Sequence, residues 1–542
     1  METIKTNLID LFQRKIYPVA ITFDTHIREI MLIEETIDGH ALPGFVDAHV
    51  HIESSMLPPS EFARLAVVHG SVATVSDPHE IANVLGVEGV NYMIDNGNLV
   101  DFKFNFGAPS CVPATSFETA GATIDSEDIR GLLERPEIKY LAEMMNWPGV
   151  LFKDPEVMKK IAISKELGKP IDGHAPGLMG DDALNYMAAG ISTDHECFTY
   201  EEGLHKLKNG MKILIREGSA AKNFEALINL FHVDPSKIMF CSDDKHPDDL
   251  IQSHLDELVR RALAKGHDLF DVLRAACINP VEHYGLDVGL LRVGDPADFI
   301  LIDEATKDLK VQATYINGKC VAAEGQSNIE RHEVAPANYF DAQKKTPDEF
   351  QLTINGQQAK VIVVKDGQLI TQTEEVPTSS FSQDDQYNMT KDLLKITVVN
   401  RYNDAPPAVA FVKNFELKEG AIASSVAHDS HNIIAVGTND LDLCEAVNQI
   451  IENKGGVAVA HGDYRSVLPL EIAGLMSTMD GYEVAEQYTA LTNYAKATLG
   501  CQLYSPFMTL SFLALLVIPQ LKLSDKGLFD GQQFKFVDLF TD

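Results

Sequence analysis

The chain has 542 residues, which is more than one ordinary domain holds and enough for two or three. Its formal net charge of −34 argues against non-specific binding to nucleic acid or anionic membranes and indicates the acidic surface of a cytoplasmic protein. The seven cysteines are scattered and form no Cys-x-x-Cys pair, so we expect a reducing compartment, no disulfide framework and no cysteine zinc site.

The first segment, residues 1–43, lacks the apolar core of a signal peptide. It predicts a short polar helix, followed by the strands Val19–Phe23 and Glu29–Glu34 of a small β-layer. Residues 285–335 carry two further strand-like runs, Leu291–Ile302 and Thr314–Val321, which we expect to return to the same layer. The two flanks of the chain would then form a β-sandwich-like layer together.

Between them, residues 44–284 alternate short β-rich runs with helical patterns such as Ser60–His69, Asp154–Leu167 and Pro247–Ala264, ending near Leu269–Cys277. Strands that alternate with helices indicate a parallel sheet. The pattern predicts an α/β fold with a (β/α)8, TIM-like barrel, and a doubly wound sheet is the alternative. The predicted strands are Phe45–Ile52, Ser71–Ser76, Phe102–Gly107, Tyr140–Met145, Pro170–Gly173, Gly190–Thr193, Lys212–Ile215 and Lys237–Cys241.

After a polar linker over residues 322–350, residues 350–542 predict a C-terminal α/β domain. Its helices are expected at Asp440–Asn453 and Tyr482–Thr498. The apolar run Ser511–Ile518 is too short to span a bilayer and predicts a buried helix or strand. Further strands are expected at Lys360–Val364, Leu394–Val399, Ala408–Val412, Ile433–Gly437 and Gly456–Ala460.

The first barrel strand carries His49 and His51, and a period of two places both imidazoles on one face. Two imidazoles on a rigid strand can chelate one divalent ion. A half-buried strand with two polar residues is the alternative for an isolated His-x-His pair. The rest of the chain therefore has to decide between these two interpretations.

Polar residues also follow most of the other predicted strands, where the catalytic groups of such barrels lie. The predicted metal ligands are His49, His51, His174, His195 and Asp243, with Glu143 placed to bridge two ions. A bound divalent ion lowers the pKa of water from about 15.7 to about 7. Asp243 can accept the proton of that water and pass it to a leaving group. We therefore expect hydrolysis at carbon in amides, ureas or amidine-like rings, and not in phosphoesters, because no Gly-rich phosphate loop accompanies the site.

Several segments resemble known families along nearly the whole chain. Those that resemble the amidohydrolase superfamily are Pro43–His51, Gly173–His174, Thr193–His195, Ser242–Asp243, Asn279–Pro280 and Gly294–Asp298. Those that resemble, more narrowly, the bacterial adenine deaminase family are His51–Leu57, Ser76–Asn83, Ile171–Leu178, Ile215–Asn223, Val426–Asn432 and Gly455–His461.

This resemblance implies hydrolysis of adenine to hypoxanthine and ammonia, a purine-salvage reaction, with two Mn²⁺ or Fe²⁺ ions expected at each site. The partner is then a small molecule, adenine, with no nucleic acid or membrane, and the chain is expected to form a dimer or a larger homo-oligomer. Many relatives bridge their metals with a carboxylated lysine on the fourth strand. Here Lys139 lies at the opposite end of that strand, and Glu143 takes the bridging position as a ready-made carboxylate.

The group that protonates the purine ring is not evident, because Ala175–Leu178 contains no acid where several ring deaminases carry a glutamate. We hypothesise that Glu80 or Glu196 is this catalytic acid, with Glu53 as a third choice and a candidate for substrate binding. Each could instead orient a ligating histidine. Arg216 could bind a ring nitrogen, or it could form an ion pair with Glu217 or another acid.

Two other functions remain open from the sequence. One is hydrolysis of another cyclic amide or aminopurine on the same barrel. The other is a scaffold without catalysis, which the complete set of predicted ligands disfavours. In the C-terminal domain, His428, His431 and His461 could form a further metal site or reach into a neighbour's barrel, although a domain that covers the barrel mouth is the simpler interpretation.

Overall fold

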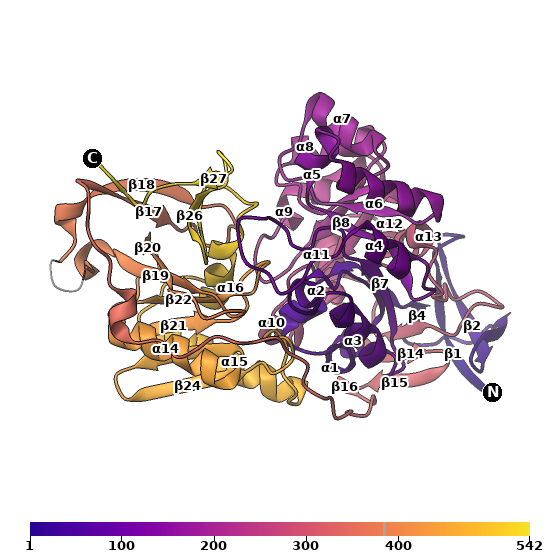
Figure 1. Cartoon of the computed structure of the whole chain (residues 1–542). Coiled ribbons are helices and arrows are strands. Elements are labelled where there is room, and N and C mark those ends of the chain that lie inside the picture. The colour runs from indigo at the N-terminus through magenta and orange to yellow at the C-terminus, as the bar shows by residue number, and fades with distance from the viewer. Residues whose placement is uncertain (383–385) are drawn as a thin grey trace.

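The computed structural model describes residues 1–382 and 386–542 (Figure 1). Residues 1–327 lie on the right of Figure 1. The C-terminal unit, residues 358–542, lies on the left. Among the described residues, none of the helices combines the length and the apolarity needed to cross a bilayer.

The β-layer is one sheet in which both flanks of the chain take part. Its strand order is β16-β15-β14-β13-β4-β1-β2-β3. The bounds are β1 (Glu2–Asp10), β2 (Lys15–Phe23), β3 (Ile27–Leu32), β4 (His40–Pro43), β13 (Phe299–Ile302), β14 (Val311–Ile316), β15 (Lys319–Ala323) and β16 (Gln326–Ser327). The two flanks meet where β4 pairs antiparallel with β13.

The predicted polar helix at the N-terminus is wrong, because Glu2–Asp10 is strand β1 and pairs with β2 from Glu2 to Asp10. Thr6 and Leu8 on this strand are both buried, which is the period of two that a strand presents to a core. Polar composition suggested a solvated helix, but the burial of Thr6, Leu8 and Ile9 and the pairing with β2 decide the structure.

The predicted parallel sheet is confirmed, and it is strongly curled. One run has the order β5-β6-β7-β8-β9 and a second has the order β10-β11-β12. Where the two runs meet, between β9 and β10, Ser192 N donates to Ile171 O at 3.0 Å. At their other edges, a β-bridge between Val50 and Asp243 joins β5 to the residues that follow β12. The strands are β5 (Phe45–Val50), β6 (Ser71–Ser76), β7 (Lys103–Ala108), β8 (Ile138–Met144), β9 (Ile171–Gly173), β10 (Thr193–Asp194), β11 (Lys212–Arg216) and β12 (Ile238–Cys241).

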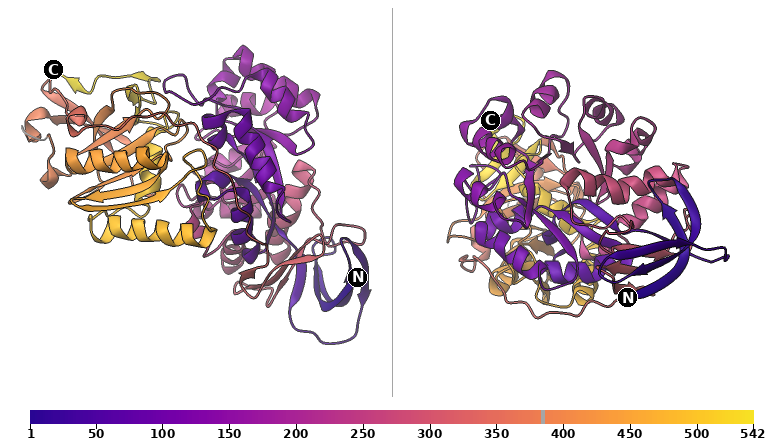
Figure 2. Two further views of the ribbon diagram at one scale, coloured as in Figure 1. Left: turned by 60° about the horizontal axis from the view of Figure 1, so that its bottom comes forward. Right: turned by 90° about the vertical axis from the view of Figure 1, so that its right-hand side faces the viewer.

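Helices pack around the outer side of the curled sheet (Figure 2). The predicted helix Pro247–Ala264 is interrupted at His254, whose backbone is not helical and whose ring contacts Asp47 and Ser71. The main helices are α1 (Pro59–Ala66), α2 (His79–Leu85), α3 (Val87–Gly97), α4 (Ser126–Leu133), α5 (Trp147–Leu151), α6 (Pro155–Glu166), α7 (Gly180–Ala188), α8 (Tyr200–Lys208), α9 (Phe224–Leu227), α10 (Pro247–Leu250), α11 (Leu255–Ala264), α12 (Leu269–Leu273) and α13 (Asn279–Tyr284).

The C-terminal unit contains a second sheet, of order β18-β17-β20-β19-β22-β21-β23-β24 with β28 beside β17, and a small sheet β25-β26-β27. Its helices are α14 (Asp440–Asn453), α15 (Gly481–Ala497) and α16 (Pro506–Ser511). The strands are β17 (Gln358–Val363), β18 (Gln372–Pro377), β19 (Leu394–Val399), β20 (Ala408–Lys413), β21 (Ala421–Ser424), β22 (Ile433–Gly437), β23 (Gly456–His461), β24 (Tyr464–Pro469), β25 (Leu521–Ser524), β26 (Gly527–Asp530), β27 (Lys535–Phe536) and β28 (Phe540–Thr541).

The C-terminal unit packs against the end of the curled sheet at which the strands finish. Helix α15 lies against α10 and α1, and Arg64 forms an ion pair with Asp480 at 2.8 Å. The buried ring of His246 contacts the hydroxyl of Tyr488 on α15 through Nδ1, at 2.5 Å. A histidine next to the curled sheet is therefore enclosed by the C-terminal unit.

We predict that this enclosed histidine makes stability fall in acid. Burial lowers the pKa of His246 to about 3, whereas an unfolded histidine has a pKa of about 6.5. Between these values the unfolded chain binds a proton that the folded chain excludes, so stability is full above about pH 6.5 and falls as the pH decreases towards 3. At pH 5 the loss from this group is about 2 kcal/mol.

Urea unfolding at pH 7.5 and pH 5 measures the effect. A His246→Gln variant is expected to lose about 2 kcal/mol less than the wild type over this interval, and a variant at the exposed residue His26 is expected to behave like the wild type. Equal pH dependence in His246→Gln and the wild type would contradict the prediction.

Candidate metal centre

The histidines at the end of β5 and the aspartate that follows β12 face one another. His49 Nε2 lies 3.2 Å from His51 Nε2, and Asp243 Oδ1 lies 3.3 Å from each of them. The strand backbone fixes this arrangement, because Asp243 N donates to His49 O and His51 N donates to Asp243 O. Each of the three residues is at most 4% exposed. The structure thus brings together three of the predicted ligands.

These spacings fit a cation. Neighbouring ligand atoms around an ion with bonds of about 2.1 Å lie about 3.0–3.4 Å apart. Two buried imidazole nitrogens and a carboxylate oxygen occupy such positions here. The other ring nitrogen of His49, Nδ1, is buried and has no hydrogen-bond partner among the described residues. The donor set contains only nitrogen and oxygen, which suits Mn²⁺, Fe²⁺ or Zn²⁺.

Glu143, near the end of β8, lies between these residues and a second group of ligands. Its Oε2 is 2.9 Å from His174 Nδ1 and 3.1 Å from His195 Nε2, while its Oε1 is 3.6 Å from His51 Nε2. His174 Nε2 is buried without a hydrogen-bond partner in the described part of the chain. Each oxygen of the carboxylate therefore faces a different group of histidines.

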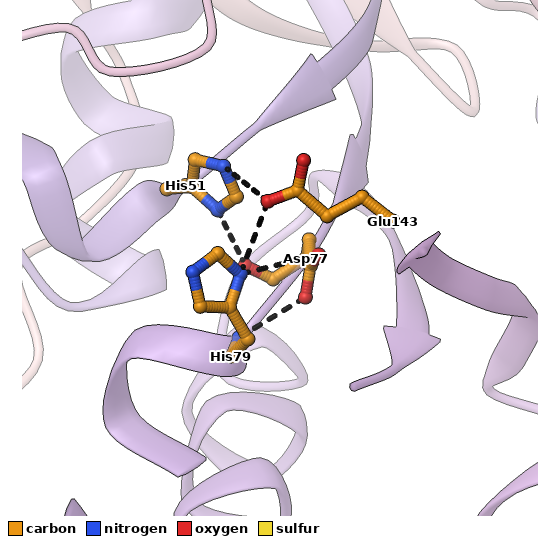
Figure 3. Close-up of side chains that lie close together, drawn as sticks. All are labelled: His51, Asp77, His79 and Glu143. Atoms are coloured by element: carbon orange, nitrogen blue, oxygen red, sulfur yellow. Dashed lines mark hydrogen bonds and ion pairs between the residues drawn. The ribbon is translucent and has the colours of Figure 1, made fainter. Parts of the chain in front are cut away.

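His79 also enters this site, although it was not among the predicted ligands (Figure 3). It begins helix α2, and its Nδ1 lies 3.3 Å from Asp77 Oδ2 and 3.5 Å from Glu143 Oε1. His51, Asp77, His79 and Glu143 form one buried group that could hold a metal ion. The signal in the sequence was its place directly after the second barrel strand, two residues beyond Asp77.

The carboxylates of the centre stay ionised despite their burial. Burial alone would favour the protonated form, but His174 and His195 outweigh it and hold the pKa of Glu143 well below its usual range. Burial likewise opposes ionisation of Asp243, and the adjacent Arg216 guanidinium outweighs it, so the pKa of Asp243 is also well below its usual range. Two charged carboxylates in a buried site are the ligands that divalent ions prefer.

Arg216, at the end of β11, donates hydrogen bonds to two acids and to the backbone. Its Nη1 donates to Asp243 Oδ2 at 2.6 Å and also to Glu196, its Nη2 donates to Glu196 Oε2 at 3.1 Å, and its Nε donates to Ala221 O. Glu217, the nearest acid in sequence, instead pairs with Arg261 at 2.6 Å. Of the two roles that the sequence left open for Arg216, contact with the substrate or an ion pair with an acid, the structure has the ion pair, with Glu196 and Asp243.

A cavity lies over the predicted metal ligands, between the curled sheet and the C-terminal unit. Its lining combines the ligands with apolar side chains and with acids. Glu80 and Glu196 belong to this lining, whereas Glu53 accepts a hydrogen bond from Ile81 N and burial raises its pKa to about 7. The apolar lining residues are Met145, Leu369, Phe512 and Leu515.

The C-terminal unit contributes polar residues to the same cavity. Between β21 and β22, His428 and Asp429 reach the lining, and His428 Nδ1 lies 2.5 Å from Glu80 Oε1. The other oxygen of Glu80 contacts His431 Nε2. These histidines therefore reach the barrel side of their own chain. His461 lies elsewhere and contacts Glu419 at 3.2 Å.

Comparison with known proteins agrees with these observations. The model of the amidohydrolase family matches residues 40–321, and that of the adenine deaminase C-terminal domain matches residues 368–535. The adenine deaminase of Sulfurovum sp. (strain NBC37-1) is 58% identical over 536 residues, 99% of each chain. That of Salinibacter ruber is 56% identical over 545 residues, 100% of this chain and 99% of the relative.

Among solved structures, a β-aspartyl dipeptidase from Fervidobacterium islandicum AW-1 matches with a TM-score of 0.45 and 16% identity, over 60% of this chain and 98% of that one. The full-length relatives carry the assignment. This chain belongs to the amidohydrolase family and, within it, to the adenine deaminases.

Proposed function

We infer that this chain hydrolyses adenine to hypoxanthine and ammonia. The observation that carries this function is the convergence of the six predicted ligands. His51, Glu143, His174, His195 and Asp243 line one cavity, and His49 Nε2 lies 3.2 Å from His51 Nε2. The apolar side chains of the same lining suit a flat ring. Relatives that share more than half of the residues over the full length are adenine deaminases.

We propose that strands β5–β12 close into a (β/α)8 barrel over residues 44–284. The bridge between Val50 and Asp243 and the hydrogen bond from Ser192 to Ile171 support closure at the two edges. Residues 1–43 and 285–335 would form the flanking β-layer, and residues 350–542 the C-terminal domain. The homo-oligomeric state stays a prediction from the sequence.

A divalent metal belongs to this site, and we propose two ions of Mn²⁺ or Fe²⁺. His49, His51 and Asp243 would hold one ion, and His174 and His195 the other, with Glu143 between them. The carboxylate of Glu143 supports this division, because its Oε1 faces His51 and its Oε2 faces His174 and His195. When bound, such ions lower the pKa of water from about 15.7 to about 7.

The residues of the chain then handle the protons of the reaction. A C6–O bond forms and the C6–N bond breaks, with one proton of the attacking water going to ring nitrogen N1 and the other to the departing amino group. We propose that Asp243 accepts protons from the oxygen and delivers one to the amino group. Its position between the His49–His51 pair and Arg216 supports this role.

For the proton on N1, we propose Glu80 together with His428 and His431. Of the three glutamates considered from the sequence, Glu196 is bound by Arg216 and Glu53 lies behind the cavity against Ile81 N. Glu80 lines the cavity and contacts both histidines. Burial opposes protonation of His428, but the Glu80 carboxylate outweighs it and raises the pKa of His428 to about 9, so this group of residues retains a proton at neutral pH.

Ultraviolet absorbance with adenine, after purification with added Mn²⁺, tests the function. We expect conversion to hypoxanthine, and we expect a His51→Ala variant to lose more than about 100-fold in rate, since even indirect partners of a metal contribute 10–100-fold. Conversion of other aminopurines or cyclic amides in place of adenine would overturn the substrate. An unchanged rate and metal content in His51→Ala would overturn the metal site.

A further inference from the structure

The carboxylate of Glu80 is held at both oxygens by histidines that lie far away in sequence. His428 Nδ1 contacts Oε1 at 2.5 Å across a separation of 348 residues, and His431 Nε2 contacts Oε2 across 351 residues. All three side chains are at most 3% exposed. A carboxylate with a partner at each oxygen cannot rotate without breaking a buried hydrogen bond.

The C-terminal unit fixes the two imidazoles from behind. The ring of His428 stacks on Phe512 with centroids 4.5 Å apart and planes 11° apart, and its backbone N donates to Ser511 O. Arg401 is fully buried and donates to the backbone oxygen of His431 at 3.3 Å. These contacts set the positions of both rings independently of the metal ligands.

Glu80 needs such support because it is a buried carboxylate that shares its cavity with other acids. These acids are Asp244 and Asp429, and His79 Nε2 lies 3.6 Å from Glu80 Oε1. A buried carboxylate among other carboxylates has no fixed orientation unless donors hold it. In this chain, the two histidines of the C-terminal unit act as those donors.

We propose that His428 and His431 are positioning residues for adenine hydrolysis, which orient the Glu80 carboxylate on the wall of the cavity. This inference rests on the proposed function and on the assigned role of Glu80. Both histidines act through Glu80, whereas the predicted metal ligands are positioned by the barrel strands. Their loss is therefore expected to lower kcat while metal content and KM change little.

Side-chain amides provide a sharp test, because their nitrogens reach different positions of an imidazole. An asparagine amide lies near the position of Nδ1, which His428 uses, and a glutamine amide lies near that of Nε2, which His431 uses. We expect His428→Asn and His431→Gln to stay within about tenfold of wild-type kcat. The swapped variants His428→Gln and His431→Asn are expected to lose about 10–100-fold, as for other supporting partners. All four variants are polar and similar in size, so a general packing defect does not predict this order.

The second part of the test combines variants with Glu80→Gln. If the histidines act through Glu80, adding His428→Gln or His431→Asn to Glu80→Gln changes kcat by less than about threefold, because the effects of coupled residues do not add. His461→Gln is the matched control, since this histidine lies in the same unit and contacts Glu419 outside the cavity. The measurements are kcat, KM and metal content for each variant, with far-ultraviolet circular dichroism as the folding control.

Different results would contradict the role of Glu80 in the proposed function and the positioning role of His428 and His431. If Glu80→Gln keeps wild-type kcat, the role of Glu80 in the proposed function is wrong, and this inference falls with it. If Glu80→Gln is slow but the swapped histidine variants match the wild type, the inference alone is wrong. Equal losses for matched and swapped amides, or multiplying losses in the double variants, would also overturn it.

Discussion

Replacing Asp243 with asparagine is expected to lower kcat for adenine hydrolysis by about 10³–10⁴-fold, the upper range for loss of a general base. The carboxylate contacts the nitrogens of His49 and His51 through Oδ1 and Arg216 through Oδ2. Asparagine keeps an oxygen of similar size but removes the charge and the ability to accept a proton. The rate should therefore be reduced even in the molecules that retain their metal.

Metal content and kcat measured on the same Asp243→Asn preparation separate the two contributions. We expect a large loss of kcat per bound metal, and a pH–rate profile without the acidic limb that ionisation of Asp243 produces in the wild type. Because the pKa of Asp243 is held well below its usual range, the wild-type rate falls only at low pH, as the carboxylate takes up a proton. Asp248→Asn, in the helix α10 that follows Asp243, is the control. A variant with full metal and kcat within tenfold of wild type would remove Asp243 from proton transfer.

The second large effect concerns stability. Arg216→Met is expected to lower the free energy of unfolding by about 3–5 kcal/mol, because it leaves the carboxylates of Glu196 and Asp243 buried without their cation. Arg216 itself is 1% exposed, so water cannot replace the lost donors readily. Urea denaturation of the metal-free protein at pH 7.5 measures this loss.

The double variant Arg216→Met/Glu196→Gln removes one of the stranded charges and is expected to recover part of the stability. The sequence alone allowed Arg216 to bind the substrate instead. That role predicts a raised KM with wild-type stability, and such a result would contradict the structural role proposed here.

The parts of the fold that follow from local sequence could be predicted. All residues of β6 are buried, and its apolar run between polar ends is typical of a parallel strand covered on both faces. His49 and His51 were expected on one face because strand side chains alternate, and the distance of 3.2 Å between their nitrogens agrees. The repeated pairing of a strand with a polar end was sufficient to predict which residues gather at the candidate metal centre.

The strand β1, the ion pairs of Arg216 and the contacts of Glu80 could not be predicted, because they depend on residues that are distant in sequence. The strand β1 is stabilised by pairing with β2 and by the buried side chains of one face, which outweigh its polar composition. Glu217 follows Arg216 directly, but successive strand residues point to opposite faces, so the acids that pair with Arg216 come from other strands. Nothing in the spacing of the chain relates Glu80 to His428, because their contact is made by the packing of two separate units.

The division of the site between two units also sets an order of assembly during synthesis. The last of the predicted metal ligands is residue 243, whereas the second histidine that holds Glu80 is residue 431. At about 5–20 residues per second, a nascent chain carries the complete ligand set for roughly tens of seconds before the later histidine exists. The growing polypeptide can therefore acquire its metal first, and the group that orients Glu80 joins it only when the C-terminal unit has folded onto the curled sheet.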